Sequence, residues 1–344
     1  MWVRRLVLAP LVLVVATFTL VTTPALALLG AFGTRYLPGR LKILRLFWLL
    51  FVWLFRESWG ILMLFGLWVI SGFGWKIHSP WFREQHVRLI GWYLWGLVGT
   101  SQRTLGVRIV TERAPGELVV EPRTESTPML VLSRHAGAGD SFLLVHLLVN
   151  TFDRVPAVVL KDSLQLVPSI DIALHRFPNA FISPNPPPGA GVIDQIGALA
   201  AGLSDDGALV IFPEGGNFTP GRRTRAIQKL VETGLDRFVD RADELDNLLP
   251  PRPGGVLRAL DSNPEADVVV VAHTGLERLS SVSDVLHGLP MEHSIRMAWW
   301  HVPRHEIPTD PEERTDWLYE WWERIDTWID AHQEPGMPDP RVRD

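Results

Sequence analysis

The residues of this sequence that could do chemistry are a histidine and an aspartate five positions apart, His135 and Asp140. Gly137 and Gly139 lie between them, and the apolar run Met129–Leu132 precedes them. On one straight helix, at ~100° per residue, the two side chains would lie well apart around the axis. Because glycine can adopt positive φ, the segment can instead loop at a helix N-terminus and bring the carboxylate onto the imidazole. One ring nitrogen would then be held and the other left free as a general base.

A structural interpretation of the same segment is that Asp140 is an ordinary helix N-cap and His135 a loop histidine. A second segment favours the chemical interpretation. The run Ala208–Phe212 predicts a buried strand, and the polar, glycine-rich segment PEGGNFT, residues 213–219, follows it directly. Since the carboxyl ends of parallel strands meet at one edge of a sheet, we expect the two polar segments to lie together there.

The two motifs together resemble those of a known family. The spacing H(x)4D at His135 and Asp140, followed by FPEG at Phe212–Gly215, is similar to the glycerolipid acyltransferases, in particular the 1-acylglycerol-3-phosphate (lysophosphatidate) and lysophospholipid O-acyltransferases. The resemblance extends from Val107 to the region of Trp300. Residues 214–219 and 251–255 look closer to the branch that includes the lysocardiolipin acyltransferases.

The resemblance implies transfer of a fatty acyl group from a thioester, acyl-CoA or acyl carrier protein, to a hydroxyl group of a lysophospholipid. In that scheme His135 takes the proton of the acceptor hydroxyl, and Asp140 orients and stabilises the imidazolium. The thioester is a co-substrate, and neither a bound cofactor nor a metal is expected. Backbone N–H groups near Gly137 or Gly215 are the expected donors to the developing oxyanion.

The residues that would bind the substrate are less clearly marked. In the family, Glu214 and Gly215 belong to a block that helps to bind the acceptor lipid. A phosphate group favours arginine, which can bind two oxygens at once. This chain has Ser-Pro-Asn at 183–185 and Asn217 where the family pattern usually has arginines. The cations that could compensate, or otherwise contact substrate, are Arg134, Lys161, Arg222, Arg223, Arg225 and Arg252. His273 would be either an acceptor-site residue or a core histidine.

Composition separates the chain into a basic, apolar front and an acidic rear. Of the 344 residues 47% are apolar, and residues 1–113 hold thirteen Lys/Arg against three Asp/Glu, a net charge of +10. The whole chain carries −5, so the remainder carries −15. This division indicates a catalytic domain held at anionic membrane lipids by its N-terminal third, and it argues against nucleic acid as a partner. Because the sequence has no cysteine, disulfides, thiolate metal ligands and a cysteine nucleophile are excluded.

The apolar segment Leu6–Gly30 is long enough to cross a bilayer, which takes about 20 apolar residues. The alternative is a cleaved signal peptide, with Ala25–Ala27 at the cleavage site. A second apolar segment, Leu46–Phe73, contains the pair Arg56-Glu57 and would form either one helix with the charges facing protein or two interfacial helices. By the positive-inside rule, the basic loop between the two segments is expected on the cytoplasmic side of the membrane. We expect one crossing and then an interfacial stretch, with the catalytic domain on the cytoplasmic side of the cell (plasma) membrane.

Four segments follow from these patterns. Residues 1–75 are expected to form a membrane anchor and interfacial helices, 76–106 an amphipathic membrane-surface helix, 107–305 the acyltransferase domain, and 306–344 a C-terminal amphipathic helix and tail. The tryptophans and arginines of the second segment suit a membrane surface, and a helix packed on the domain explains them equally well. The acidic helix predicted at 311–331 carries a stripe of apolar residues at helical spacing, Trp317, Trp321, Ile325 and Trp328, and is expected to pack on the domain. The tail after it is expected to be disordered.

Within the domain, strands alternate with helices. This predicts an α/β fold with a mostly parallel central sheet and helices on both faces (αβα), preceded by the N-terminal membrane helices. Apolar runs predict strands at 129–132, 157–160, 179–182, 208–212, 267–272 and 296–302, with a further β-rich segment at 107–120. Helices are predicted at 142–148, 191–203 and 222–237, the last with one apolar side formed by Ile227, Leu230, Val231 and Leu235.

Two other functions are compatible with the motifs. One is a phospholipid transacylase that takes its acyl chain from a phospholipid instead of coenzyme A. The other is a non-catalytic membrane scaffold with a degenerate acyltransferase site. The missing arginines favour the scaffold, whereas the presence of His135, Asp140 and Glu214 favours an enzyme.

Overall fold

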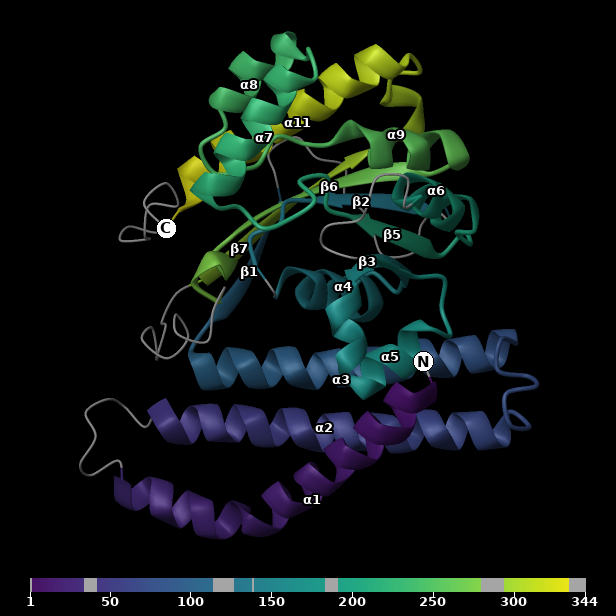
Figure 1. Ribbon diagram of the computed structural model, residues 1–344, viewed down its shortest axis with the longest axis vertical. Helices are drawn as coiled ribbons and strands as arrows, with labels where there is room; N and C mark the ends of the chain where they lie inside the picture. Colours follow the sequence, from purple (N-terminus) through teal and green to yellow (C-terminus); the bar gives the residue numbers. More distant parts are fainter. Residues whose placement is uncertain are drawn as a thin grey trace.

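The structure, a computed structural model, describes residues 2–33, 42–113, 127–137, 139–182, 191–279 and 294–333. A seven-stranded sheet forms the centre of the domain (Figure 1). The strand order is β1-β7-β6-β2-β5-β3-β4. The strands are β1 (Arg108–Arg113), β2 (Met129–Ser133), β3 (Val155–Lys161), β4 (Ala180–Ile182), β5 (Gly207–Ile211), β6 (Asp267–Thr274) and β7 (Ser294–Val302). Each predicted strand forms, and residues 114–120 of the predicted β-rich segment lie outside the described residues.

The sheet is mostly parallel, as predicted. β6, β2, β5, β3 and β4 run in one direction, β7 is antiparallel to β6, and β1 is parallel to β7. β2 and β5 are neighbours, with Leu132 beside Ile211. His135 and Glu214, which follow these two strands, are therefore delivered to the same edge of the sheet.

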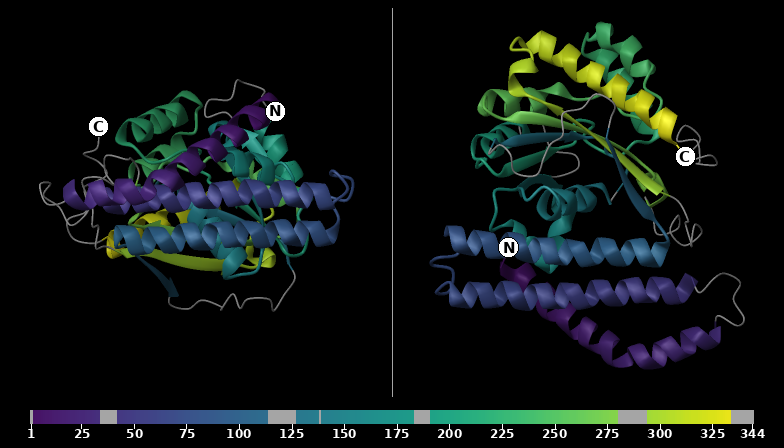
Figure 2. Two further views of the ribbon diagram at one scale, coloured as in Figure 1. Left: turned by 90° about the horizontal axis from the view of Figure 1, so that it is seen from below. Right: turned by 180° about the vertical axis from the view of Figure 1, so that it is seen from behind.

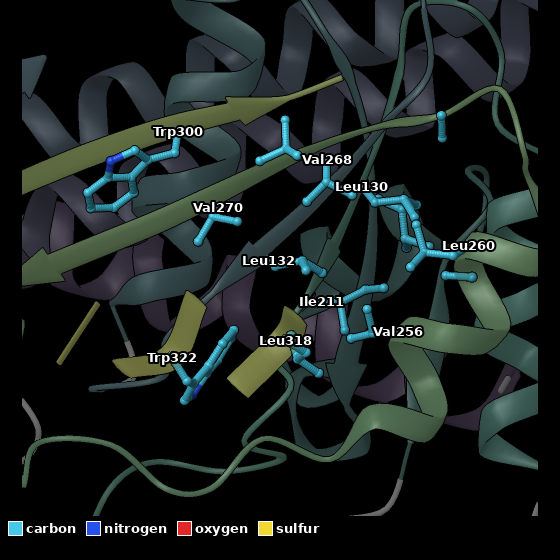
Figure 3. Packing of buried hydrophobic residues seen from close by; sticks show 14 of the residues in the cluster. Leu130, Leu132, Ile211, Val256, Leu260, Val268, Val270, Trp300, Leu318 and Trp322 are labelled. Carbon is cyan, nitrogen blue, oxygen red and sulfur yellow. The ribbon is translucent and has the colours of Figure 1, made fainter. Parts of the chain in front are cut away.

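Helices cover both faces of the sheet, which explains why the central strands are apolar without a break. Successive side chains of β2 alternate between two hydrophobic clusters, with Leu130 and Leu132 in one and Met129 and Val131 in the other. The first cluster, shown in part in Figure 3, also includes residues of α6 (Val192–Ala201), α9 (Pro253–Ser262) and α11 (Pro311–His332). The second includes residues of α4 (Asp140–Asn150) and the end of α3 (Pro80–Leu105). The αβα arrangement is confirmed.

Shorter helices connect these elements. α5 (Pro168–Leu174) follows β3, α7 (Pro220–Glu232) follows PEGGNFT, and α8 (Val239–Asp243) precedes α9. Further 3-10 turns in the described residues lie at Asp162–Leu166, Asp236–Phe238, Leu276–Leu279 and Arg304–Glu306. The predicted apolar side of α7 does not enter the core, because none of its residues is buried. α5 was not predicted, since seven residues are too few to show a helical period.

Helix α11 packs on the domain, as its acidic outer face predicted. Its fully buried apolar and aromatic side chains are Leu318, Tyr319, Trp322, Ile325 and Ile329. Three of the four residues of the predicted stripe, Trp317, Trp321 and Trp328, pack around these and are only partly buried. The predicted core face is therefore shifted by one position, with the larger indole rings at its rim. The tail beyond Gln333 lies outside the described residues.

Three long helices form a layer on one side of the domain (Figures 1 and 2). α3 lies nearest to the domain, α2 (Lys42–Ile70) lies beyond it, and α1 (Trp2–Gly33) is outermost along most of its length. Two stretches in this layer are long and apolar enough to cross a membrane, Arg5–Thr23 and Leu44–Ile70. Large apolar side chains are exposed along both helices, among them Phe18 and Phe65. These features suggest membrane association.

The charged pair in α2 does not interrupt the helix, so the alternative of two short helices is wrong. Both side chains face protein. Glu57 is fully buried and accepts hydrogen bonds from the Ser169 N–H at 2.8 Å, the Ser169 hydroxyl at 2.5 Å and the Tyr93 hydroxyl at 3.1 Å. Arg56 donates to the Trp92 carbonyl at 2.6 Å. The pair thus fixes α2 against α3 and α5.

Helix α3 lies between α2 and the domain, which agrees with the interpretation of its tryptophans as part of a helix packed on the domain (Figure 1). Phe82, Tyr93 and Leu94 are buried by this packing, whereas Trp81 and Trp95 are exposed. Contact of these two tryptophans with lipid stays a prediction.

Helix α1 is tied to the domain near its start. Arg5 Nε donates to Asp171 Oδ2 at 2.6 Å, and Arg5 Nη2 donates to the Asp171 carbonyl at 3.1 Å. The Asp171 side chain, on α5, is 1% exposed. This ion pair therefore joins two helices that lie 166 positions apart in the sequence.

Candidate active site

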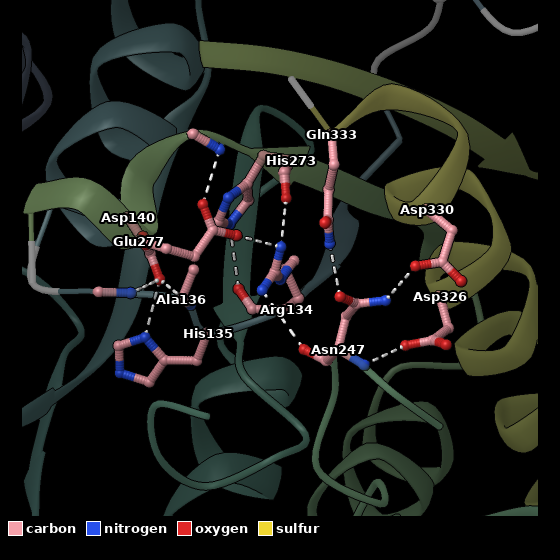
Figure 4. A network of polar contacts seen from close by, with 12 residues as sticks. Arg134, His135, Ala136, Asp140, Asn247, His273, Glu277, Asp326, Asp330 and Gln333 are labelled. Atoms are coloured by element: carbon pink, nitrogen blue, oxygen red, sulfur yellow. Dashed lines mark hydrogen bonds and ion pairs between the residues drawn. The ribbon is translucent and has the colours of Figure 1, made fainter. Parts of the chain in front are cut away.

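The loop between β2 and α4 brings His135 and Asp140 into contact (Figure 4). Asp140 Oδ2 lies 2.9 Å from His135 Nδ1 and also accepts hydrogen bonds from the N–H groups of Ala136 at 2.6 Å and Gly137 at 2.8 Å. Asp140 is the first residue of α4 and not its N-cap. Its carboxylate therefore binds N–H groups of the preceding loop and does not act as the N-cap of the helix. The loop closes without the positive φ expected of its glycines, since the φ of Gly139 is −82°.

Asp140 is fully buried and nevertheless ionised at neutral pH. Burial alone would raise the pKa of this carboxyl, but the imidazoles of His273 and His135 and the Gly137 N–H outweigh burial and lower it. A hydrogen bond to a charged group contributes about 1.5–3 kcal/mol, so three on one oxygen can offset the cost of burial. A carboxylate facing Nδ1 assigns the proton to that nitrogen and leaves Nε2 of His135 as the basic one.

The PEGGNFT segment holds the backbone of His135 from the adjacent strand. The His135 N–H donates to Glu214 Oε1 at 2.7 Å, and its carbonyl accepts from the Phe218 N–H at 3.2 Å. The imidazole stacks on Phe212, with ring centroids 4.6 Å apart and planes 29° apart. Such a contact contributes about 0.5–1.5 kcal/mol and restricts the orientation of the ring. The two polar segments thus meet at one sheet edge, as predicted.

Glu214 is a buried link between two loops. It is 1% exposed, and its second oxygen accepts from the Leu249 N–H at 2.9 Å. Burial raises the pKa of Glu214 to about 8, and the Asp140 charge adds to this against the opposing effects of Arg134 and the two N–H donors. Direct contact with an acceptor lipid, which the resemblance implies, stays a prediction.

Arg134 points away from His135 into the protein (Figure 4). Its guanidinium donates to the His273 carbonyl at 2.7 Å and to Glu277 Oε1 at 2.6 Å, and the side chain is 3% exposed. Neighbouring residues of an extended segment point to opposite sides, so the prediction that Arg134 binds substrate is wrong. His273 is a core histidine: it is fully buried, its Nε2 lies 3.2 Å from the Arg134 carbonyl, and burial lowers its pKa.

Arg222 and Arg252, two of the cations predicted to bind substrate, lie beside the turn that follows Glu214. A Cβ added at Gly215 would lie 3.0 Å from Arg252 Nη1, and one added at Gly216 would lie 3.2 Å from Arg222 Nη1. Both arginines are exposed. Gly215 has a φ of +69°, a conformation that strongly favours glycine. Two guanidinium groups therefore flank the turn that adjoins the His135 loop.

The other predicted cations are placed differently. Arg223 donates to the carbonyls of Leu245 at 2.8 Å and Asp243 at 2.5 Å, so its guanidinium holds α7 against the segment that follows α8. Lys161 is exposed at the end of β3 and lines a cavity beside His135. Arg225 is exposed on α7.

Donors to an oxyanion were expected among the backbone N–H groups near Gly137 or Gly215. The Gly137 N–H donates to Asp140, and the Gly215 N–H donates to the Phe212 carbonyl at 3.0 Å, so these two groups are already bonded within the protein. The first turn of α4 is placed for the task instead, because Ser141 and Phe142 line the same cavity as His135.

An apolar cavity of about 360 Å³ lies beside His135. Its walls come from α2, α3, β3, α4 and α5, with side chains such as Leu64, Ile90, Val145, Val158 and Leu174. Tyr93, Ser163 and Ser169 are among its few polar members. Sequence reasoning missed this cavity, since five separate elements build it. Among the described residues there is no group of three or more His, Asp and Glu that could hold a metal ion.

Comparison with known proteins finds similarity to acyltransferases. Residues 117–271 match a family model described as Acyltransferase. A protein of Schizosaccharomyces pombe described as an uncharacterized acyltransferase is 24% identical over 201 residues, which cover 54% of each protein. The chain thus spans about half the length of this curated relative. The crystal structure of the 1-acyl-sn-glycerophosphate (LPA) acyltransferase PlsC from Thermotoga maritima aligns with a TM-score of 0.46 and 13% identity, covering 81% of this chain and 99% of that one.

The family model and the curated relative are both described as acyltransferases, which supports the predicted resemblance to acyltransferases. The family match includes both His135 and Glu214.

Burial of Glu214 gives a testable pH dependence. Its pKa of about 8 lies above the ordinary value of 4.5, so between these values the folded protein retains a proton that the unfolded chain has lost. This contribution to the free energy of unfolding therefore falls as pH rises from about 4.5 to 8. We expect Glu214→Gln to remove it, so that the difference in melting temperature between variant and wild type changes with pH across this range.

The measurement is thermal unfolding in detergent at pH 5, 6.5 and 8. Glu265→Gln, a change at an exposed glutamate, is the matched control and should follow the wild type. Parallel curves for wild type and Glu214→Gln would contradict the prediction.

Proposed function

We propose that the protein is a membrane-bound O-acyltransferase that moves a fatty acyl group from a thioester, acyl-CoA or acyl carrier protein, to a hydroxyl group of a lysophospholipid. One observation carries this proposal: the imidazole of His135, held by Asp140 at 2.9 Å, lines an apolar cavity. A general base beside an apolar cavity suits a reaction between a lipid hydroxyl and an acyl thioester.

His135 serves as both base and acid in this scheme. Its Nε2 takes the proton of the acceptor hydroxyl as the hydroxyl oxygen attacks the thioester carbonyl carbon. The carbon–sulfur bond then breaks, and the departing sulfur takes the proton from the imidazolium, which leaves an ester and a free thiol. The buried charge of Asp140 stabilises the imidazolium between these two steps. The N-terminal end of α4 faces the negative charge on the carbonyl oxygen.

The cavity beside His135 accommodates the acyl chain. Most of its lining is apolar, and burying each CH₂ group of an acyl chain contributes about 0.8 kcal/mol. Because α2 and α3 supply part of the wall, the chain would lie between the N-terminal layer and the sheet domain.

The acceptor headgroup is proposed to bind at Arg222 and Arg252. Arg222 donates to the Asn217 carbonyl at 3.0 Å, so its guanidinium lies beside the position where the family pattern has an arginine. Arg252 lies over Gly215 in the same turn. Two guanidinium groups beside a single turn suit one phosphate group, which arginine binds through paired hydrogen bonds.

The N-terminal layer is proposed to hold the enzyme at the membrane that contains its acceptor. Exposed apolar side chains of α1 and α2 support this, as do their two membrane-length stretches. The location at the plasma membrane and the cytoplasmic orientation stay predictions. A single crossing by α1 that leaves the domain on the side of the basic loop does not fit the ion pair of Arg5 with Asp171, which places the start of α1 beside the domain.

Replacing either member of the His135–Asp140 pair tests the proposed chemistry. His135→Ala is expected to lower kcat by about 10²–10⁴-fold, the usual contribution of a general base. Asp140→Asn keeps an oxygen for the backbone N–H groups and removes the charge, and we expect kcat to fall about 10²-fold or more. The assay follows thiol release from acyl-CoA in detergent with a panel of lysophospholipids. His305→Ala, at an exposed histidine, is the control.

Wild-type turnover in His135→Ala would exclude the proposed base. Acyl transfer from a labelled phospholipid without thiol release would instead identify a transacylase.

Narrowing the cavity should change the preferred acyl chain. Ala173 is buried on α5 and lines the cavity, so Ala173→Phe reduces the space for the chain. Overpacking of this kind costs about 1–3 kcal/mol, and we expect kcat/KM for the longest donors to fall about tenfold or more while short donors change little. The measurement compares acyl-CoA donors of increasing length. Ala198→Phe, the same change at an exposed site on α6, should leave the profile unaltered.

Removing the guanidinium groups beside Gly215 and Gly216 should weaken acceptor binding alone. We expect Arg222→Gln and Arg252→Gln each to raise the KM for the lysophospholipid about tenfold, because a charged hydrogen bond contributes about 1.5–3 kcal/mol. The KM for the thioester should stay constant. Arg225→Gln removes the same charge farther along α7 and is the control. Equal effects of all three changes would point to a general field of positive charge and contradict a headgroup site.

A further inference from the structure

A single loop connects helix α11 to the two loops of the active site. We call residues 246–252 the bracing loop; it lies between α8 and α9 in the sequence. Figure 4 shows Asn247 of this loop between Arg134 on one side and the end of α11 on the other. Each connection is a hydrogen bond to a buried or partly buried group.

On the α11 side, the loop is held by two carboxylates and an amide. Asp326 accepts from the backbone N–H groups of Asp246 at 3.1 Å and Asn247 at 2.8 Å, one through each oxygen. The Asn247 side chain donates to Asp330 Oδ1 at 2.8 Å and accepts from Gln333 Nε2 at 2.6 Å. Asn247 is 3% exposed and Asp326 is 6% exposed. These contacts fix both the main chain and the side chain of Asn247.

On the active-site side, the same loop contacts three groups around His135. The Leu249 N–H donates to Glu214, whose other oxygen holds the His135 N–H. The Asn247 carbonyl accepts from Arg134 at 3.4 Å. The Arg252 N–H donates to the Pro213 carbonyl at 2.9 Å, which sets the start of the PEGGNFT turn. A shift of the bracing loop would therefore move Glu214, and with it His135.

We propose that Asp326 and Asn247 are positioning residues for His135, acting through the bracing loop, Leu249 and Glu214. This assignment rests on the proposed function, because it concerns the rate of that reaction. α11 thereby has a second role beside closing the core with Trp322 and Ile325. An interatomic placement error of about 1 Å can cost a catalyst 10²-fold in rate, so a loosened brace is measurable without unfolding.

The substitution Asp326→Asn tests the hydrogen bonds to the bracing loop separately from the packing of α11. Asparagine has the same size, but its amide nitrogen cannot accept from a backbone N–H, so one of the two bonds to the loop is lost. We expect kcat to fall about 5- to 50-fold, with the KM values for donor and acceptor within twofold of wild type. Glu320→Gln removes the same charge from the exposed face of α11 and should leave kcat unchanged. If Asp326→Asn does not fold, Asp330→Ala, at an exposed position, removes the acceptor of the Asn247 side-chain N–H and should also lower kcat.

A double-mutant cycle shows whether the effect passes through Glu214. If it does, Asp326→Asn should lower kcat several-fold in the wild-type background and by less than twofold in the Glu214→Gln background. Equal effects in both backgrounds, at matched folded fractions, would overturn the proposal. So would an unchanged kcat in Asp326→Asn.

A second readout does not depend on acyl transfer. The rate at which diethyl pyrocarbonate modifies His135, followed by mass spectrometry, should rise several-fold in Asp326→Asn and stay at the wild-type value in Glu320→Gln. A protein that transfers no acyl group and still shows this rise would refute the proposed function and retain the positioning link. An unchanged modification rate would overturn the positioning link.

Discussion

The active site depends on one oxygen atom, Oδ2 of Asp140. It accepts from two backbone N–H groups and faces the imidazole of His135, so one buried atom fixes both the course of the loop and the orientation of the ring. The charge persists in the interior because these donors replace the water that burial removes. A neutral side chain of the same shape would bind the two loop N–H groups more weakly and would leave the imidazolium without its counter-charge.

A second acidic side chain, Glu214, joins this loop to the rest of the domain. Glu214 comes from the neighbouring strand and bonds the backbone of His135 with one oxygen and that of Leu249 with the other. The parallel pairing of β2 with β5 makes this possible, because it delivers both segments to one edge. Burial raises the pKa of Glu214 despite the opposing effects of Arg134 and two N–H donors, whereas at Asp140 the imidazoles of His273 and His135 and the Gly137 N–H outweigh burial and lower the pKa.

Local patterns in the sequence predicted the strands, the αβα layers and the contact between His135 and Asp140. They succeeded where the signal lies within a few residues: an apolar run for a strand, or a short spacing across glycines for a loop. They failed where the partner lies far along the chain. Arg134 was expected to face substrate, and its pairing with Glu277 has no local signature. The contact of Asn247 with Asp330, 83 positions away, likewise depends on how α11 docks.

The ion pair between Arg5 and Asp171 makes the outermost helix part of the architecture around the cavity, because the neighbours of Asp171 on α5, Ile170 and Ala173, line its wall. Cleavage at Ala25–Ala27 or deletion of α1 would take a guanidinium away from a carboxylate that water hardly reaches, a change that typically costs about 3–5 kcal/mol. Loss of α1 would therefore alter the structure around the cavity in addition to removing the membrane anchor.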